Sequence, residues 1–401
     1  MSEGLDLKRD IKDDEIKAAI ENEVFERSRR RHLTASEKHN IISAVFNSMR
    51  RLDILQPILE DGSVTEIMVN GTKGIFIEKD GRLIKLEACF EDTGRLEDVI
   101  QSIVSKVNRM VNQSSPIVDA RLKDGSRVNV VLPPISLDGP VITIRKFPDK
   151  PIGMKRLIEY GSITYDAAEF LKKMVTAKYN IFISGGTGSG KTTFLNALSS
   201  FIPSDERIIT IEDSAELQIT GIDNIVRMET RNANAEGKGE ISIRDLIRTA
   251  LRMRPERIIV GEVRGAEAID MLTAMNTGHD GSLSTGHANS TGDMLKRLET
   301  MVMSGTMMSS ESIRQQISSA IDIVIHLSRL RDRTRRVVEI SEVGDCGEGR
   351  IVLNPLFVFK EEKKAQGNDI SGSLKRTGNK MTRLNKLNMA GMGSEYPEGL
   401  I

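Results

Sequence analysis

Residues 185–192 read GGTGSGKT and match the pattern Gly-x4-Gly-Lys-Thr. Four of these eight residues are glycines, which let the backbone curl so that successive N–H groups converge on phosphate oxygens. The apolar segment 180–184 predicts a strand before the loop, and residues 192–201 predict a helix after it. The amino end of a helix attracts negative charge. The stretch therefore predicts a nucleotide-binding loop, with ATP and Mg²⁺ as the expected cofactors.

Individual residues of the loop have expected roles. Lys191 is expected to contact the β- and γ-phosphates, and Thr192 to ligate Mg²⁺. The alternative, a flexible glycine turn, leaves the flanking strand and helix unexplained. The residues expected to bind the nucleotide are Gly185, Gly186, Thr187, Gly188, Ser189, Gly190, Lys191, Thr192 and Thr193.

Working outward from the loop, strand and helix patterns alternate. Apolar runs at 207–211 and 257–260 predict strands, and residues 167–177 and 242–253 predict helices. This alternation predicts an α/β fold with a mainly parallel sheet and helices on both faces. Residues 321–327 alternate with period two and precede a charged turn, so we expect a late hairpin.

The amino-terminal part predicts a smaller α/β domain. Thr34 and Glu37 have the spacing of a capping box before an amphipathic helical stripe that includes Ile41, Phe46 and Met49. Strands are expected at 65–69, 74–79, 83–86, 127–132 and 141–147, with a turn at 80–81 and a helix over 96–110. The expected division is a charged lead-in segment at 1–33, this domain at 34–147, an interdomain linker at 148–164, an ATPase domain at 165–358, and a polar, mobile tail at 359–401.

Composition limits the class of protein. The 401 residues carry 57 basic and 57 acidic side chains, and 39% of residues are hydrophobic, which is enough for packed cores. No apolar run approaches the ~18 residues that span a bilayer, and the amino terminus has no signal-peptide core. The two cysteines have no metal-ligand spacing. We expect a cytoplasmic protein, and the neutral charge argues against nucleic-acid binding through a general basic surface.

Two glutamates follow predicted strands. Glu212 follows the strand at 207–211, and Glu262 follows the strand at 257–260. Open α/β sheets bind ligands at the carboxyl ends of their strands, and hydrolysis needs one carboxylate near Mg²⁺ and another that polarises water. Gly261 stands where a Walker B motif usually has aspartate, so which glutamate is the base stays open. We favour Glu212 as the base and Glu262 for the magnesium shell.

Histidines and arginines give weaker signals. His287 is a candidate γ-phosphate sensor, His279 is equally explained as structural, and His326 is expected to be structural or exposed. From spacing alone, Arg127 and Arg145 are ordinary strand arginines. The arginines around the late turn are expected to face solvent or a neighbouring subunit, with nucleic-acid binding as the alternative. They are Arg329, Arg331, Arg333, Arg335 and Arg336. The methionines expected to pack in cores are Met271, Met275, Met301, Met303, Met307 and Met308.

Three motifs in order, GGTGSGKTT, ITIEDSAEL and RMRPERIIVGEVRGAEAIDMLTAMNTGHDGSLSTGHANS (252–290), resemble secretion ATPases of the type II/IV superfamily. DGSVTEIMVNG (61–71), residues 119–147 and the ending YPEGLI resemble the Flp/Tad pilus assembly ATPase (CpaF) branch in particular. The chain has no CxxC, whereas many type II secretion and type IV pilus extension ATPases carry a tetracysteine zinc insert.

The resemblance implies a RecA-like P-loop NTPase domain preceded by a smaller α/β domain, assembled into a homo-hexamer with ATP bound between the two domains. It implies catalytic roles for Lys191, Glu212, Glu262 and His287, with Arg127 and Arg145 presented to the phosphates from the amino-terminal domain.

The predicted function is a Mg²⁺-dependent ATPase motor that powers Flp/Tad-type pilus assembly or protein secretion. It would act at the inner face of the cytoplasmic membrane through platform proteins there, without direct nucleic-acid binding. The main alternative is a nucleic-acid translocating or packaging ATPase with a related core. A non-hydrolysing nucleotide-gated scaffold is a third hypothesis. An ABC transporter subunit is disfavoured because the chain has no LSGGQ-like signature.

Overall fold

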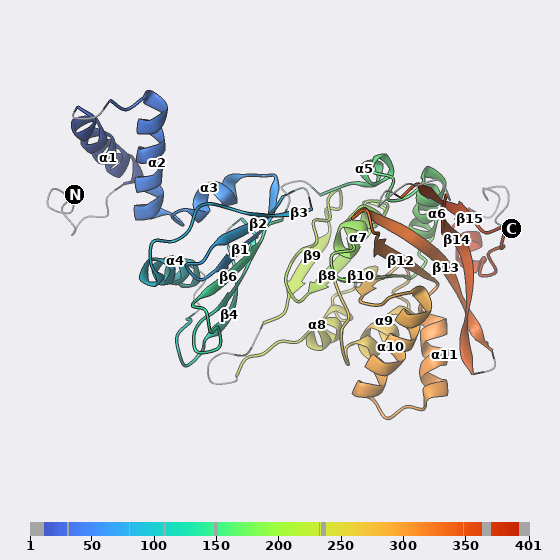
Figure 1. Cartoon of the computed structure of the whole chain (residues 1–401). Coiled ribbons are helices and arrows are strands. Elements are labelled where there is room, and N and C mark those ends of the chain that lie inside the picture. Colours follow the sequence, from blue (N-terminus) through green and yellow to red (C-terminus); the bar gives the residue numbers. More distant parts are fainter. Residues whose placement is uncertain are drawn as a thin grey trace. The chain divides into compact units, whose positions relative to one another are not determined.

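The computed structural model describes residues 12–29, 32–79, 81–106, 110–122, 124–147, 151–231, 233, 238–347, 349–362 and 370–392. The chain forms two compact units, residues 1–149 and 150–401, which are described separately (Figure 1). Within the described residues, no helix is both long and apolar enough to cross a membrane.

Unit 1 begins with a pair of helices, α1 (Asp13–Ser28) and α2 (Ala35–Arg50). The expected capping box is confirmed, because the Thr34 hydroxyl accepts from the Glu37 amide and the Glu37 carboxylate accepts from the Thr34 amide. Phe46 of α2 packs in a small core with Ile16, Ile20 and Val24 of α1. Two members of the predicted stripe, Ile41 and Met49, are exposed instead, so the buried face is narrower than the pattern indicated.

The rest of unit 1 is an antiparallel sheet with a covering helix. Its six strands lie in the order β3-β2-β1-β6-β5-β4. Apolar side chains of α4 (Thr93–Ser105) share a core with alternating residues of the strands, so the predicted amphipathic helix is confirmed up to Ser105. Met110, predicted on the same face, lies beyond the helix and is exposed. Asp80 of the predicted turn lies outside the described residues, although β2 and β3 do pair antiparallel. The remaining elements are α3 (Leu55–Glu60), β1 (Val64–Asn70), β2 (Ile75–Lys79), β3 (Arg82–Lys85), β4 (Ile117–Arg121), β5 (Arg127–Val131) and β6 (Val141–Arg145).

Unit 2 is built on a nine-stranded sheet in the order β15-β14-β13-β12-β7-β11-β10-β8-β9. The six strands from β12 to β9 are parallel to their neighbours, and β13, β14 and β15 add antiparallel strands at the other side. The predicted late hairpin is β12–β13. The strands are β7 (Ile181–Gly185), β8 (Ile208–Glu212), β9 (Ile225–Glu229), β10 (Arg257–Val260), β11 (Leu283–Gly286), β12 (Ile323–Arg329), β13 (Arg335–Gly347), β14 (Arg350–Glu361) and β15 (Gly372–Arg376).

Helices cover both faces of this sheet, as the alternating pattern predicted. One core contains residues of α5, α6, α7 and α12, and the other contains residues of α8, α9, α10 and α11. Figure 1 shows α9, α10 and α11 grouped together on one side of the strands. The helices are α5 (Met154–Glu159), α6 (Tyr165–Thr176), α7 (Lys191–Ser199), α8 (Ile243–Ala250), α9 (Ala268–Asn276), α10 (Thr291–Gly305), α11 (Ser310–Ala320) and α12 (Asn385–Met389).

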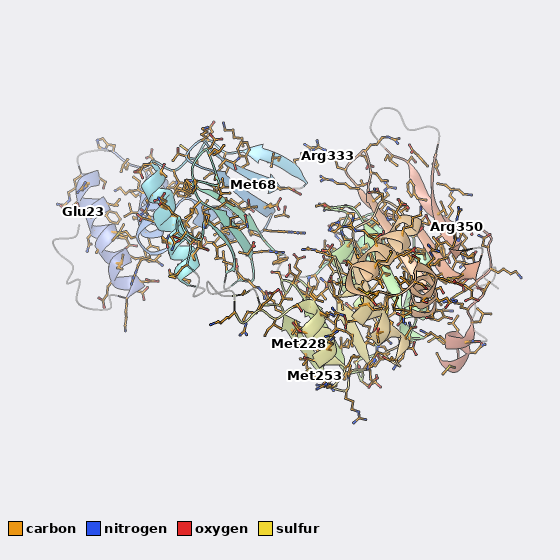
Figure 2. All side chains as sticks on the ribbon, turned by 90° about the horizontal axis from the view of Figure 1, so that it is seen from below. Glu23, Met68, Met228, Met253, Arg333 and Arg350 are labelled. Atoms are coloured by element: carbon orange, nitrogen blue, oxygen red, sulfur yellow. The ribbon has the colours of Figure 1, made fainter. Side chains whose placement is uncertain are left out.

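Most of the predicted core methionines are buried, with two exceptions. Met271, Met275 and Met301 lie in the core on the α9–α10 side, and Met308 packs against it. Met303 and Met307 are exposed, so for these two the prediction was wrong. Met228 and Met253, labelled in Figure 2, are partly buried against the same core.

Two segments expected to be loose belong to the fold of unit 2. Residues 148–164 were expected to be a linker, but they contain α5, and Met154, Leu157 and Ile163 are buried in the first core. The expected mobile tail supplies β15, which pairs with β14, and α12. Leu374 and Leu387 of that tail are buried in the first core. A few well-spaced apolar residues were therefore enough to anchor a stretch whose average composition is polar.

Candidate nucleotide site

The predicted phosphate loop connects β7 to α7. Strand β7 is buried along its whole length and ends at Gly185, and α7 begins at Lys191. Gly190 has φ +95°, in the left-handed region that glycine adopts readily. A Cβ at Gly185 would lie 2.5 Å from the Ser189 hydroxyl and 2.6 Å from the Leu327 carbonyl oxygen. Glycine is thus required at 185 because neighbouring atoms approach too closely for a Cβ, and at 190 because of the backbone conformation. Residues 186–188 are exposed, so a ligand can reach them.

The Lys191 ammonium lies against the phosphate loop and is bound by uncharged acceptors. Its Nζ donates to the carbonyl oxygens of Gly185 and Gly186, each at 3.1 Å, and lies 3.2 Å from Nδ1 of His287. These partners replace part of the hydration that the buried ammonium loses. Phosphate oxygens are stronger, charged acceptors for the same donors, so the arrangement fits a phosphate ligand.

His287 links Lys191 to Glu262. Its Nε2 lies 2.8 Å from Oε1 of Glu262. Burial, and then the charge of Lys191, lower the pKa of the His287 imidazole, which favours the neutral ring. Because the Lys191 ammonium can only donate, Nδ1 of the neutral ring accepts and the ring proton sits on Nε2. Nε2 lies next to Oε1 of Glu262, but the geometry there does not form a hydrogen bond.

Glu262 lies just after β10, as expected, but its carboxylate is already engaged. Besides His287, it pairs with Arg264, whose guanidinium lies 2.8 Å from Oε2 and also 3.6 Å from a carboxylate oxygen of Asp213. No sequence motif points to Arg264 as a site residue. Its contact with Glu262 became visible only in the structure. A Mg²⁺ shell that includes Glu262 would have to share this carboxylate with two other groups or bind it through water.

Glu212 ends β8 and is almost fully buried. Its Oε1 accepts from the amides of Glu216 at 2.8 Å and Leu217 at 2.9 Å. Burial nevertheless raises the pKa of this carboxyl to about 7, against the lowering effect of the two amides. A carboxylate with a pKa near 7 is suited to accept a proton from water at neutral pH.

Gly261, the residue directly after β10, has a packing role. A Cβ at Gly261 would lie 3.0 Å from Cγ of Glu212. The departure from the usual Walker B form therefore makes room for the Glu212 side chain.

The fold separates His279 from the site. His279 precedes β11, whereas His287 follows it, so the two histidines lie beyond opposite ends of one strand. Nδ1 of His279 lies 3.2 Å from the carbonyl oxygen of Ala274, near the end of α9. The contacts of His279 thus support a structural role for this residue.

The late-turn arginines are largely tied into unit 2. Arg335 differs from the expectation: its Nε donates to the carbonyl oxygen of Gly188, in the phosphate loop, at 2.8 Å. Arg331 pairs with Glu361, and Arg336 donates to the carbonyl oxygens of Gly372 and Ile370. Arg333, labelled in Figure 2, lies in the turn with φ +67°.

Arg127 and Arg145 belong to the sheet of unit 1. They are directly opposed residues of the neighbouring antiparallel strands β5 and β6. Arg145 is also opposite Glu66 of β1. Their proposed contact with phosphates stays a prediction.

A family model described as "Type II/IV secretion system protein" matches residues 49–377. This chain belongs to that family. The chain is similar to the VirB11 protein of the Brucella suis type IV secretion system, with 31% identity over 324 residues, covering 73% of this chain and 88% of VirB11. A Mycobacterium tuberculosis protein named for conjugal transfer is 34% identical over 304 residues, covering 74% of this chain and 86% of the relative.

The fold of this chain is similar to that of a solved structure. The Legionella pneumophila ATPase DotB has a TM-score of 0.52 and 24% identity, covering 73% of this chain and 80% of DotB. The predicted α/β architecture, with a RecA-like P-loop core preceded by a smaller α/β domain, is therefore confirmed, and so is membership of the type II/IV superfamily.

Proposed function

We propose that this protein hydrolyses ATP with Mg²⁺ and uses the energy to drive a secretion or pilus-assembly machine. The observation that carries the proposal is the chain of contacts Lys191–His287–Glu262, assembled from the phosphate loop and the ends of β10 and β11. The names of the relatives, which include conjugal transfer and type IV secretion proteins, are consistent with such a role.

In the proposed reaction, the loop amides and Lys191 would bind the phosphates, and Thr192 and Glu262 would hold Mg²⁺, which would supply positive charge to the phosphates. Glu212, with its raised pKa, orients the attacking water and accepts its proton. His287 senses the γ-phosphate, because a phosphate that attracts Lys191 removes the donor now facing Nδ1. Arg127 and Arg145 would stabilise charge in the transition state from unit 1.

The finer proposal is a homo-hexamer of the Flp/Tad (CpaF) branch. It would work in the cytoplasm at the inner face of the membrane, attached through platform proteins. The motifs at 61–71 and 119–147 favour this branch, and the missing zinc-insert cysteines favour either it or the conjugation-like branch. Mass measurement with and without a non-hydrolysable ATP analogue tests the hexamer.

The deciding experiment is a turnover assay of the purified full chain with ATP and Mg²⁺, with and without platform proteins or double-stranded DNA. We expect turnover that platform proteins increase and DNA does not. Strong stimulation by DNA that falls steeply with salt would instead support the nucleic-acid motor. Tight nucleotide binding without turnover would support the scaffold hypothesis.

A further inference from the structure

A buried histidine with no role in the proposed reaction lies beneath the nucleotide site. His326 of β12 is only 7% exposed and stands directly opposite Ser184 of β7, the residue before Gly185. Its Nδ1 lies 3.0 Å from the Ser184 hydroxyl oxygen, and Ser184 itself is fully buried. A buried polar pair at this place must be satisfied locally, because water does not reach it.

The Ser184 hydroxyl has a second partner, which determines the direction of the hydrogen bonds. It donates to the carbonyl oxygen of Ser290 at 3.3 Å. Since a hydroxyl has one proton, Nδ1 of His326 must be the donor to Ser184 Oγ while that bond exists. Burial lowers the pKa of His326, so the ring is neutral and its proton is on Nδ1 in this arrangement.

Ser290 connects this pair to the sensing segment. It lies three residues after His287 and caps α10, accepting from the Asp293 amide at 3.0 Å. The next residue, Thr291, is buried and donates to a Glu339 carboxylate oxygen at 2.7 Å. Glu339 of β13 is the cross-strand partner of His326. The network thus joins the strand before the phosphate loop, the segment after His287, and the β12–β13 hairpin.

We propose that His326 is a positioning residue: its hydrogen bond to Ser184 directs the Ser184 hydroxyl to Ser290 and so holds residues 287–290 against the phosphate loop. Gly185, next to Ser184, accepts from Lys191, and His287 faces the same ammonium. A small displacement at Ser290 would therefore move the imidazole relative to Lys191. The consequence for turnover rests on the proposed function, whereas the positioning itself does not.

The test compares substitutions of His326 that keep or remove a hydrogen-bond donor at the position of Nδ1. Asparagine can place its side-chain N–H near Nδ1 of the histidine, whereas alanine cannot donate. In the full chain, hydrogen exchange of peptides covering 283–291 is measured for wild type, His326→Ala, His326→Asn and Ser184→Ala. We expect about 3–10-fold faster exchange in the two alanine variants, the range that one buried hydrogen bond provides, and near wild-type exchange in His326→Asn.

Turnover gives an independent readout. His326→Ala should lower kcat about 3–10-fold and change KM for ATP less than about twofold, and His326→Asn should restore kcat. The double variant His326→Ala/Ser184→Ala should be no worse than either single variant, because both break one connection. His279→Ala is the matched control, a histidine at the other end of β11, and should leave exchange over 283–291 unchanged.

Unchanged exchange over 283–291 in His326→Ala would overturn the proposal, as would equal loss in His326→Asn or fully additive effects of the two alanine changes. If His326→Ala does not fold, the comparison of Ser184→Ala with His326→Asn decides the same question. Wild type without any ATP turnover would refute the proposed function, while the exchange experiment would still test the positioning.

Discussion

The two ends of the parallel strands in unit 2 both carry buried charged groups, but they are satisfied differently. At the carboxyl ends, Lys191 is held by two backbone carbonyls and a neutral histidine beside exposed loop residues. At the amino ends, Asp322 accepts from the Asn180 amide and from Lys386, each at 2.7 Å, and Lys386 also contacts Asp280 at 2.6 Å.

The carboxyl-terminal segment closes the amino end further. The fully buried carboxylate of Glu342 accepts from the amides of Thr382 and Arg383, and the Tyr179 hydroxyl donates to the Arg383 carbonyl oxygen at 2.5 Å. Charges at this end are covered by permanent partners, whereas those at the other end have partners that a polyanion can replace. In this unit, burial of charge therefore marks a ligand site only where the partners of the charged group are exchangeable.

The largest effect should follow loss of the exchangeable cation. Lys191→Ala should lower kcat/KM for ATP on the order of 10³–10⁵-fold, because it removes a positive charge from the transferring phosphate. The free energy of unfolding should not fall, since a buried ammonium is removed. Both are measured by turnover and by thermal unfolding of the full chain. Turnover near wild type would disprove the site.

Glu212→Gln should lower kcat about 10²–10⁴-fold, the usual contribution of a general base. Glutamine keeps a carbonyl oxygen for the Glu216 and Leu217 amides, so the local fold is preserved. Full turnover in this variant, together with an inactive Glu262→Gln, would reverse the assignment of the two glutamates.

At the closed end, Lys386→Met should act on stability and not on turnover. It leaves the Asp322 carboxylate, which burial already holds at a raised pKa, without its cation. We expect the free energy of unfolding to fall by about 2 kcal/mol, less than for a fully buried pair because Lys386 is partly exposed. Adding Asp322→Asn should recover part of the loss. A tenfold loss of kcat in folded Lys386→Met would break the distinction between the two ends.

The pH dependence of turnover should report Glu212. A base with a pKa raised to about 7 is protonated below that pH, so kcat/KM should fall about tenfold per pH unit below 7 and level off above it. The sign for stability is the reverse: between the ordinary pKa of 4.5 and about 7, only the folded state holds the proton, so stability falls as pH rises. Glu212→Gln should abolish that part of the stability profile, as followed by denaturant unfolding.

The smallest effect is expected for Arg335→Ala. Loss of the hydrogen bond to the Gly188 carbonyl should loosen the phosphate loop and raise KM for ATP about 3–10-fold, with kcat nearly unchanged. Arg333→Ala, in the adjoining turn, is the matched control. Equal effects of the two would indicate a general loss of positive charge and not support of the loop.

Much of the site was readable from the chain because its signals are local. The loop with its strand and helix, and the glutamates at the end of β8 and just after β10, depend on glycine spacing and on apolar runs within a few residues. The linker and tail were misjudged because composition averages hide isolated apolar anchors such as Leu157 and Leu374.

The phosphate loop, the α/β class and the family could be predicted from the chain alone, since each rests on short patterns or on motif order. Which polar groups meet depends on the tertiary structure. Lys191 contacts His287 across 96 positions, and Arg335 contacts Gly188 across 147. Such pairings depend on the order of strands in the sheet, with β12 and β11 on either side of β7. Strand order arises from the packing of the whole unit, and no local pattern encodes it.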